Sequence, residues 1–180
     1  MNFVKNVKLS VNYSSSKHVT HFLEVAKSRS VKTRKVRNIL VLKDKLTLIL
    51  FVRSNNSYHL NITGIKDLHL VNDAIIWLEN TYCNKSEFSL LSYNIDNITS
   101  SFDTFRHIPL DNLANVVSNC SYNPERFHAL YSKSRDGMVI VFQTGKVNIV
   151  GCKSLKTYYH YGGLSKQKYM LRGATKHYRN

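Results

Sequence analysis

The residue types that carry out catalysis or bind metals are present in this chain, but their spacing favours neither activity. His18 and His21 lie three residues apart, and no third ligand at metal-binding spacing accompanies them. Cys120 and His128 could pair as a nucleophile and its base, although a buried thiol is the more common role of such a cysteine. The carboxylates are scattered, and neither GxSxG nor HExxH occurs. The spacing therefore predicts no enzymatic activity, no metal site and no cofactor.

Hydrogen bonding by short polar side chains is a second kind of chemistry that the spacing supports. Side chains on one face of a strand recur every second residue. Four β-type segments place the following residues on one face: Asn6, Lys8, Asn61, Thr63, Asn97, Thr99, Asn148 and Val150. The alternate residues of these strands, which lie on the opposite face, are apolar, as at Val7, Ile62 and Ile149, and we expect helices to cover that face. A bare face of Asn and Thr can hydrogen-bond the acceptors of a nucleic acid, and an ordinary solvated sheet face is the alternative.

Apolar periodicity identifies the elements that would carry these residues. An alternating strand begins at Phe3, and a helix with period 3.6 follows through Val19, Phe22, Leu23 and Ala26. Residues 46–63 and 138–150 each predict a β-hairpin, and residues 68–82 predict a second amphipathic helix that Asp67 caps. This order of elements predicts an α+β fold, with an antiparallel sheet that carries helices on one face.

The chain also matches itself at an offset of 91 residues. Residues 4–7 align with residues 95–98, and Phe51 aligns with Phe142. The apolar pattern then persists, with a slip of four residues, through the glycine-containing segments 62–66 and 149–153. We predict two copies of one unit, at residues 1–90 and 91–180.

The charge of the chain narrows the classes of partner. Its 26 Lys and Arg residues outweigh 11 Asp and Glu residues, which gives a formal net charge of +15. The excess divides into +8 and +7 between the two halves, and residues 27–37 are especially basic. Nucleic acid is the first partner to expect, ahead of an anionic membrane or an acidic protein. No apolar run approaches the ~18–20 residues of a membrane span, and three cysteines without a CxxC motif fit a reducing compartment.

Two sequence segments in the second half of the chain resemble a known protein family. Residues 121–130 read SYNPERFHAL, and residues 138–153 read MVIVFQTGKVNIVGCK. They resemble the repeat of the TATA-box-binding protein (TBP) family, YxPxxFxxL followed by IFxSGKxVxTGAK. The segments 4–7 and 95–98 resemble the opening strand of that family's repeats.

The resemblance implies a saddle of two pseudo-symmetric repeats, with helices on the convex face and a concave sheet that binds the minor groove of A·T-rich promoter DNA. Asn6 and Asn97 match asparagines that contact the base edges, and Thr63 and its counterpart Val150 match positions on the same surface. Phe127 and Phe142 match one pair of side chains that wedge into a base step, whereas Phe51 and Val36 match the other pair. The family's valines on the DNA-facing surface are replaced here by Lys8, Thr99, Asn61 and Asn148.

This resemblance implies a general transcription initiation factor that bends promoter DNA and recruits a TFIIB-like initiation factor and RNA polymerase subunits, with no membrane partner. The alternative is a TBP-fold interaction subunit that has lost specific TATA binding. The high Asn, Lys, Tyr and Ser content is typical of an AT-rich genome, so we expect a nuclear protein or, in a large DNA virus, one of the cytoplasmic viral factory.

Overall fold

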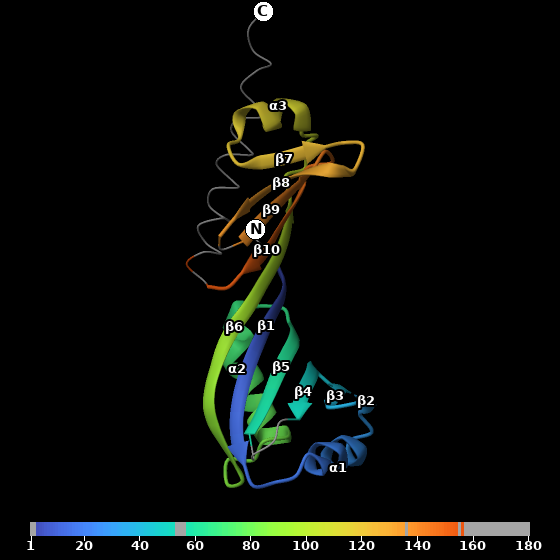
Figure 1. Ribbon diagram of the computed structural model, residues 1–180, viewed down its shortest axis with the longest axis vertical. Helices are drawn as coiled ribbons and strands as arrows, with labels where there is room; N and C mark the ends of the chain where they lie inside the picture. The colour runs from blue at the N-terminus through green and yellow to red at the C-terminus, as the bar shows by residue number, and fades with distance from the viewer. Residues whose placement is uncertain (1–2, 53–56, 136, 155, 157–180) are drawn as a thin grey trace, which may run out of the picture. The chain divides into compact units, whose positions relative to one another are not determined.

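The structure, a computed structural model, describes residues 3–52, 57–135, 137–154 and 156 (Figure 1). It divides into two compact units, which are Asn6–Asp96 (the first unit) and Met1–Lys5 with Asn97–Asn180 (the second unit). Ten strands are hydrogen-bonded in the order β2-β3-β4-β5-β1-β6-β10-β9-β8-β7, and β6 contributes to both units. The repeat boundary at residues 90 and 91 stays a prediction.

The first unit contains most of β1 (Phe3–Ser15) and the opening part of β6 (Phe88–Asp103). Its remaining elements are α1 (Thr20–Ser28), β2 (Lys32–Val36), β3 (Ile39–Lys43), β4 (Thr47–Val52), β5 (Ser57–Ile65), the 3-10 helix η1 (Leu68–Leu70) and α2 (Val71–Thr81). The Asp67 side chain accepts a hydrogen bond from the backbone N–H of His69 at 3.0 Å, so the predicted cap is confirmed.

The core of the first unit lies between the helices and one face of its strands. Alternate strand residues such as Leu9, Leu50 and Ile62 are fully buried, as are Phe22 of α1 and Leu78 of α2. In Figure 1, α2 lies behind β1 and β5. The predicted parity is therefore confirmed, since one face of these strands is apolar and packed under helices.

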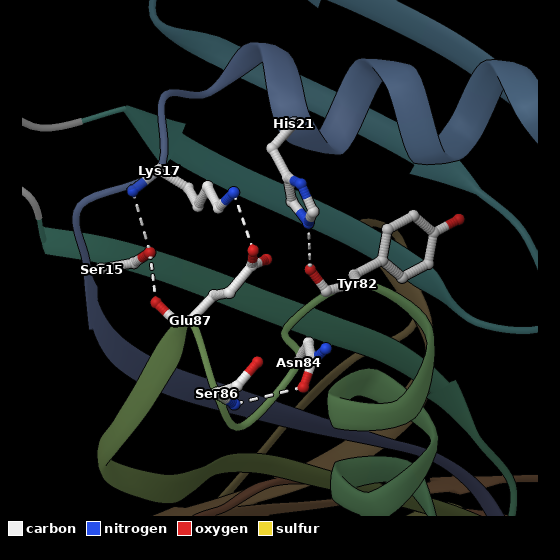
Figure 2. Close-up of polar contacts among 7 residues, drawn as sticks. All are labelled: Ser15, Lys17, His21, Tyr82, Asn84, Ser86 and Glu87. Atoms are coloured by element: carbon white, nitrogen blue, oxygen red, sulfur yellow. Dashed lines mark hydrogen bonds and ion pairs between the residues drawn. The ribbon is translucent and has the colours of Figure 1, made fainter.

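Polar contacts join the end of β1 and the start of α1 to the α2–β6 connection (Figure 2). The Ser15 hydroxyl donates to the carbonyl of Glu87 at 2.6 Å, and the Lys17 ammonium lies 2.7 Å from the Glu87 carboxylate. His21 Nε2 contacts the carbonyl oxygen of Tyr82 at 3.0 Å. These contacts fix α1 against the connection that feeds the long strand β6.

A second polar group ties the β3–β4 turn to the helices. The Tyr82 hydroxyl donates to Asp44 at 2.9 Å, and Arg29 Nε lies 3.4 Å from the same carboxylate. Burial, together with the hydrogen bond to Asp44, raises the pKa of Tyr82 to about 12. Burial also raises the pKa of Asp44, but hydrogen bonds from Tyr82 and the Lys45 backbone, together with the Arg29 charge, outweigh it and leave that pKa below its ordinary value.

The second unit contains the rest of β6 with α3 (Leu110–Val116), β7 (Cys120–Asn123), β8 (Phe127–Ser134), β9 (Gly137–Phe142) and β10 (Lys146–Cys152). Its core is formed by Leu130, Val141, Val147 and Ile149, all fully buried. Figure 1 shows α3 beside β7. The predicted α+β architecture is thus confirmed in both units, and the antiparallel hairpins β4–β5 and β9–β10 lie where the sequence predicts them.

The β9–β10 turn is the tightest point of the second unit. Gly145 has a φ of +92°, a conformation that glycine adopts without strain. A Cβ atom at this position would collide with the carbonyl oxygen of Arg106 and would lie 2.6 Å from Thr104 Oγ1. The turn carbonyl accepts a hydrogen bond from the Thr104 backbone N–H at 3.0 Å, which holds the turn against the loop after β6.

Candidate nucleic-acid interface

The face of each unit opposite its buried core carries the predicted polar residues, and we call it the open face. In the first unit, strand register places Asn61 opposite Ile49 on β4 and opposite Ser10 on β1. In the second unit, Asn148 lies opposite Ile140 on β9 and Ser101 on β6. The same row of Ser, Asn and Ile therefore occurs in both units, as the predicted repeat requires.

Asn6 and Asn97 have equivalent hydrogen bonds in their respective units. The backbone N–H of Gly64 donates to Asn6 Oδ1 at 2.7 Å, and that of Gly151 donates to Asn97 Oδ1 at 2.9 Å. Both glycines have positive φ, +101° and +80°, next to irregularities in strand register that turn their N–H groups toward the asparagines. Because each amide oxygen is bound internally, the amide NH₂ is the end of each side chain that is left to donate to a ligand, although in Asn97 it also lies within 3.4 Å of the Thr99 hydroxyl.

The remaining predicted residues on β5, β6 and β10 share this face and are half-buried. Thr99 lies near Asn97, whose Nδ2 is 3.4 Å from the threonine hydroxyl. Thr63 and Val150 are half-buried and lie opposite Thr47 and Met138 respectively. The predicted counterparts therefore differ, since the first unit has a hydroxyl where the second has an apolar side chain.

The open face also carries an acidic group, Asp96, beside the predicted Lys8. The Lys8 ammonium lies 3.2 Å from Asp96, and the Ser10 hydroxyl donates to the same carboxylate at 2.8 Å. The Lys8 charge is thus largely compensated. Sequence reasoning missed Asp96 because its partners on β1 are more than eighty residues away, and only the pairing of β1 with β6 brings them together.

The two side chains that are predicted to act as a wedge in the second unit, Phe127 and Phe142, are neighbours. The rings of Phe127 and Phe142 meet edge to face, with centroids 6.2 Å apart. Phe127 remains 46% exposed, which is more than a core position would allow. This exposure argues against the simpler interpretation that both rings belong to the hydrophobic core.

The corresponding cluster in the first unit is smaller and includes residues that sequence reasoning missed. Register places Val36 opposite Ile39, Ile39 opposite Phe51, and Phe51 opposite His59. Val36 and Ile39 are exposed, and the rings of Phe51 and His59 lie 5.6 Å apart. The family resemblance pointed to Val36, whereas the tight turn between β2 and β3 brings Ile39 directly opposite Phe51.

Cys120, weighed above as a nucleophile, and His18, weighed as a metal ligand, contact other groups. The Cys120 thiol contacts the carbonyl oxygen of Val117 at 3.1 Å, and His18 contacts Thr20. Within residues 3–52, 57–135, 137–154 and 156, no group of three or more His, Cys, Asp or Glu side chains could hold a metal ion. Over the same residues, no helix has the length and apolar character needed to cross a membrane.

Comparison with known proteins gives consistent results. Residues 92–161 match the family model "Transcription factor TFIID (or TATA-binding protein, TBP)". A TATA-box-binding protein of Pyrococcus abyssi is 26% identical over 157 residues, which cover 84% of this chain and 80% of that protein. Its counterpart in Pyrococcus horikoshii is 31% identical over 70 residues, 38% of this chain and 37% of that protein.

The structural comparison extends the likeness to nearly the whole chain. The solved structure of Methanococcus jannaschii TBP matches with a TM-score of 0.69 at 20% sequence identity, and the match covers 94% of this chain and 98% of that one. At this identity the likeness establishes the fold, and it confirms the predicted α+β fold class of the TBP type.

Proposed function

Because the chain carries a divergent TBP-like core, we propose that it is a non-enzymatic transcription initiation factor that binds A·T-rich promoter DNA. The open face of the sheet would lie in the minor groove of the duplex. The net charge of +15 supplies the attraction to phosphates that any such factor needs.

One observation carries this proposal, namely the paired fixation of Asn6 and Asn97 by glycine N–H groups. In the minor groove, A·T and T·A pairs present only the acceptors adenine N3 and thymine O2. An asparagine whose oxygen is already bound internally offers donors, which is what those acceptors require. The same arrangement in both units suits a ligand with the approximate two-fold symmetry of a duplex.

The exposed aromatic side chains supply the second element of the proposed mechanism. Inserting apolar wedges between base steps partly unstacks them and bends the duplex. Phe127 and Phe142 form the larger wedge, whereas Phe51 with Ile39 and Val36 forms a smaller one. We therefore expect the base step under the second unit to be kinked more strongly than the one under the first.

Recruitment belongs to the helix-bearing side of the units in this proposal, since the open face would be occupied by DNA. We propose that a TFIIB-like initiation factor and RNA polymerase subunits bind there, and that the protein works where its promoters are, in the nucleus or in a cytoplasmic viral factory.

The Lys8–Asp96 ion pair on the open face favours the second candidate function, an interaction subunit without specific TATA binding, because a carboxylate there opposes phosphate contact.

Electrophoretic shift and bending assays on A·T-rich duplexes test the proposal. The double variant Phe127→Ala, Phe142→Ala should lose most of the bend and bind at least about tenfold more weakly, because about 1–3 kcal/mol of stacking per base is lost. The matched control is Phe105→Ala, which removes a ring that is 91% exposed in the loop between β6 and α3. Unchanged affinity and bend in the double variant would refute the wedge, and lack of any preference for A·T-rich DNA in the unmodified protein would favour the interaction subunit.

A further inference from the structure

Two other asparagines of the open face, Asn61 and Asn148, differ from the pair that glycine N–H groups fix. Neither side chain forms a hydrogen bond with any residue that the structure describes. Asn61 is only 9% exposed, and its Oδ1 atom is buried without a partner. An unpaired buried amide oxygen is unfavourable unless something supplies a donor.

The surroundings of these two asparagines are alike and rich in acceptors. Ser10 lies opposite Asn61, and Ser101 lies opposite Asn148, so each amide has a hydroxyl beside it. The Ser10 hydroxyl already donates its proton to Asp96, which leaves its lone pairs free to accept. The terminal torsion of asparagine is broad and roughly two-fold, so the amide can turn its oxygen toward the open face at little cost.

A duplex offers one base donor to such an acceptor in the minor groove. A·T and T·A pairs expose acceptors there, and the donor is the exocyclic N2 amine of guanine. We infer that Asn61 and Asn148 accept a hydrogen bond from this amine, so that the open face admits a G·C pair at one defined place in each half of its duplex. This inference rests on the proposed function and identifies the DNA sequence class that the site would bind, A·T-rich with single G·C pairs.

The four asparagines thereby have two distinct tasks. Asn6 and Asn97 have their oxygens bound and donate, which suits the acceptors of every base pair. Asn61 and Asn148 have unengaged oxygens and read the feature that separates G·C from A·T. A side chain of similar size without an oxygen, such as valine, would leave the guanine amine desolvated and unpaired, and would therefore reject guanine.

Replacing guanine by inosine tests this directly, since inosine lacks only the N2 amine. A single G·C pair is placed at each position of a bound A·T-rich duplex in turn, and affinity is compared with the same duplex carrying I·C. At one position in each half, the unmodified protein should bind the guanine duplex about 3- to 10-fold more tightly than the inosine duplex. Because this comparison uses the unmodified protein, it does not depend on any variant folding.

The variants Asn61→Val and Asn148→Val assign each position to its residue. Each should abolish the preference for guanine over inosine at one position and leave the other position unchanged. Asn72→Val on α2 is the matched control and should preserve both preferences. Equal binding of guanine and inosine at every position, with A·T-rich binding intact, would overturn this inference alone, whereas failure to bind any of the duplexes would overturn the proposed function with it.

Discussion

Replacing Asn97 with aspartate would separate the two ends of its amide group. The carboxylate keeps an oxygen where Oδ1 now accepts from the Gly151 N–H at 2.9 Å, and a charged acceptor strengthens such a bond. The amide NH₂, in contrast, is exchanged for a second oxygen. Asn97→Asp should therefore leave the free energy of unfolding within about 0.5 kcal/mol of its original value while removing the proposed contact to DNA.

The loss of affinity follows from the contact that is removed. A base contact in a groove is worth about 1–3 kcal/mol, which corresponds to a dissociation constant raised roughly 5- to 150-fold. Aspartate also places a negative charge against the acceptor atoms of the base edge, so the effect should lie in the upper part of this range. Asn97→Ala should lose a similar contact to DNA and, in addition, about 0.5–1.5 kcal/mol of stability with the Gly151 hydrogen bond.

The assays are titration of an A·T-rich duplex by anisotropy and chemical denaturation of the free protein. The matched control is Asn84→Asp, because Asn84 Oδ1 likewise accepts a backbone N–H, that of Ser86 at 3.1 Å, in the connection after α2 (Figure 2). Wild-type affinity in Asn97→Asp would refute the assignment of its NH₂ as a donor to DNA. A loss of stability equal to that of Asn97→Ala would instead refute the role of Gly151 in orienting the side chain.

Three further outcomes follow from the structure and are checked by denaturation or by thiol labelling. Gly145→Ala should lower the free energy of unfolding by about 2–4 kcal/mol, because the new Cβ would collide with the backbone. Gly64→Ala should lower it by only about 1–2 kcal/mol, the cost of a left-handed backbone, because the nearest atom to its Cβ is 3.6 Å away. Equal losses in the two variants would contradict this explanation. Iodoacetamide should label Cys120 before Cys83 in the native protein, because Cys120 is only partly buried. Burial and the nearby Glu79 raise the pKa of the Cys83 thiol, so little reactive thiolate forms there. Rapid labelling of Cys83 would contradict its burial. The pKa of Asp44 is lower in the folded protein than in the unfolded chain, so its ionised carboxylate stabilises the fold fully above the unfolded-state pKa. This stabilisation is lost as the pH falls through the folded-state pKa. Asp44→Asn should therefore make the free energy of unfolding less dependent on pH on the acid side.

Strand and helix positions could be predicted because they depend on local periodicity. The buried parity of Leu9 and Ile62, and the cap at Asp67, were readable from neighbouring residues alone. The repeat also placed Asn6 and Asn97 on one face before any strand pairing was known. Periodicity sets which face a side chain occupies, and it was sufficient for that part of the candidate site.

The contacts within the site could not be predicted, because they depend on strands that are distant in sequence. The Asn6–Gly64 hydrogen bond needs the shift in register between β1 and β5, and the Lys8–Asp96 pair needs the pairing of β1 with β6. A turn of two residues after Val36 decides that Ile39 lies opposite Phe51. No repeating pattern in the sequence indicates which residues of these strands pair. Only the Asn6–Gly64 contact has a local signal, because Gly64 and Gly151 occupy the same place in the two predicted repeats.

The open faces of the two units have diverged in the row beyond the shared Ser, Asn and Ile. In the first unit, Arg34 lies opposite Val41, and Lys32 lies directly opposite Lys43 on neighbouring strands. In the second unit, the row continues instead through Tyr131 to Ser121. Lys32, Arg34 and Lys43 form no ion pair with any residue that the structure describes, although like charges opposite one another destabilise a sheet.

Repulsion between two opposed lysines is tolerated most readily where a bound anion offsets it. If phosphates lie along the edge of the first unit, Lys32 and Lys43 would be neutralised by DNA, and the unfavourable pair would become a source of affinity. The second unit has fewer cations on its open face but the larger aromatic wedge, so its contribution would come from bending the base step. A duplication would account for the similar net charges of residues 1–90 and 91–180, and under the proposed function the open faces would supply attraction mainly in the first unit and deformation mainly in the second.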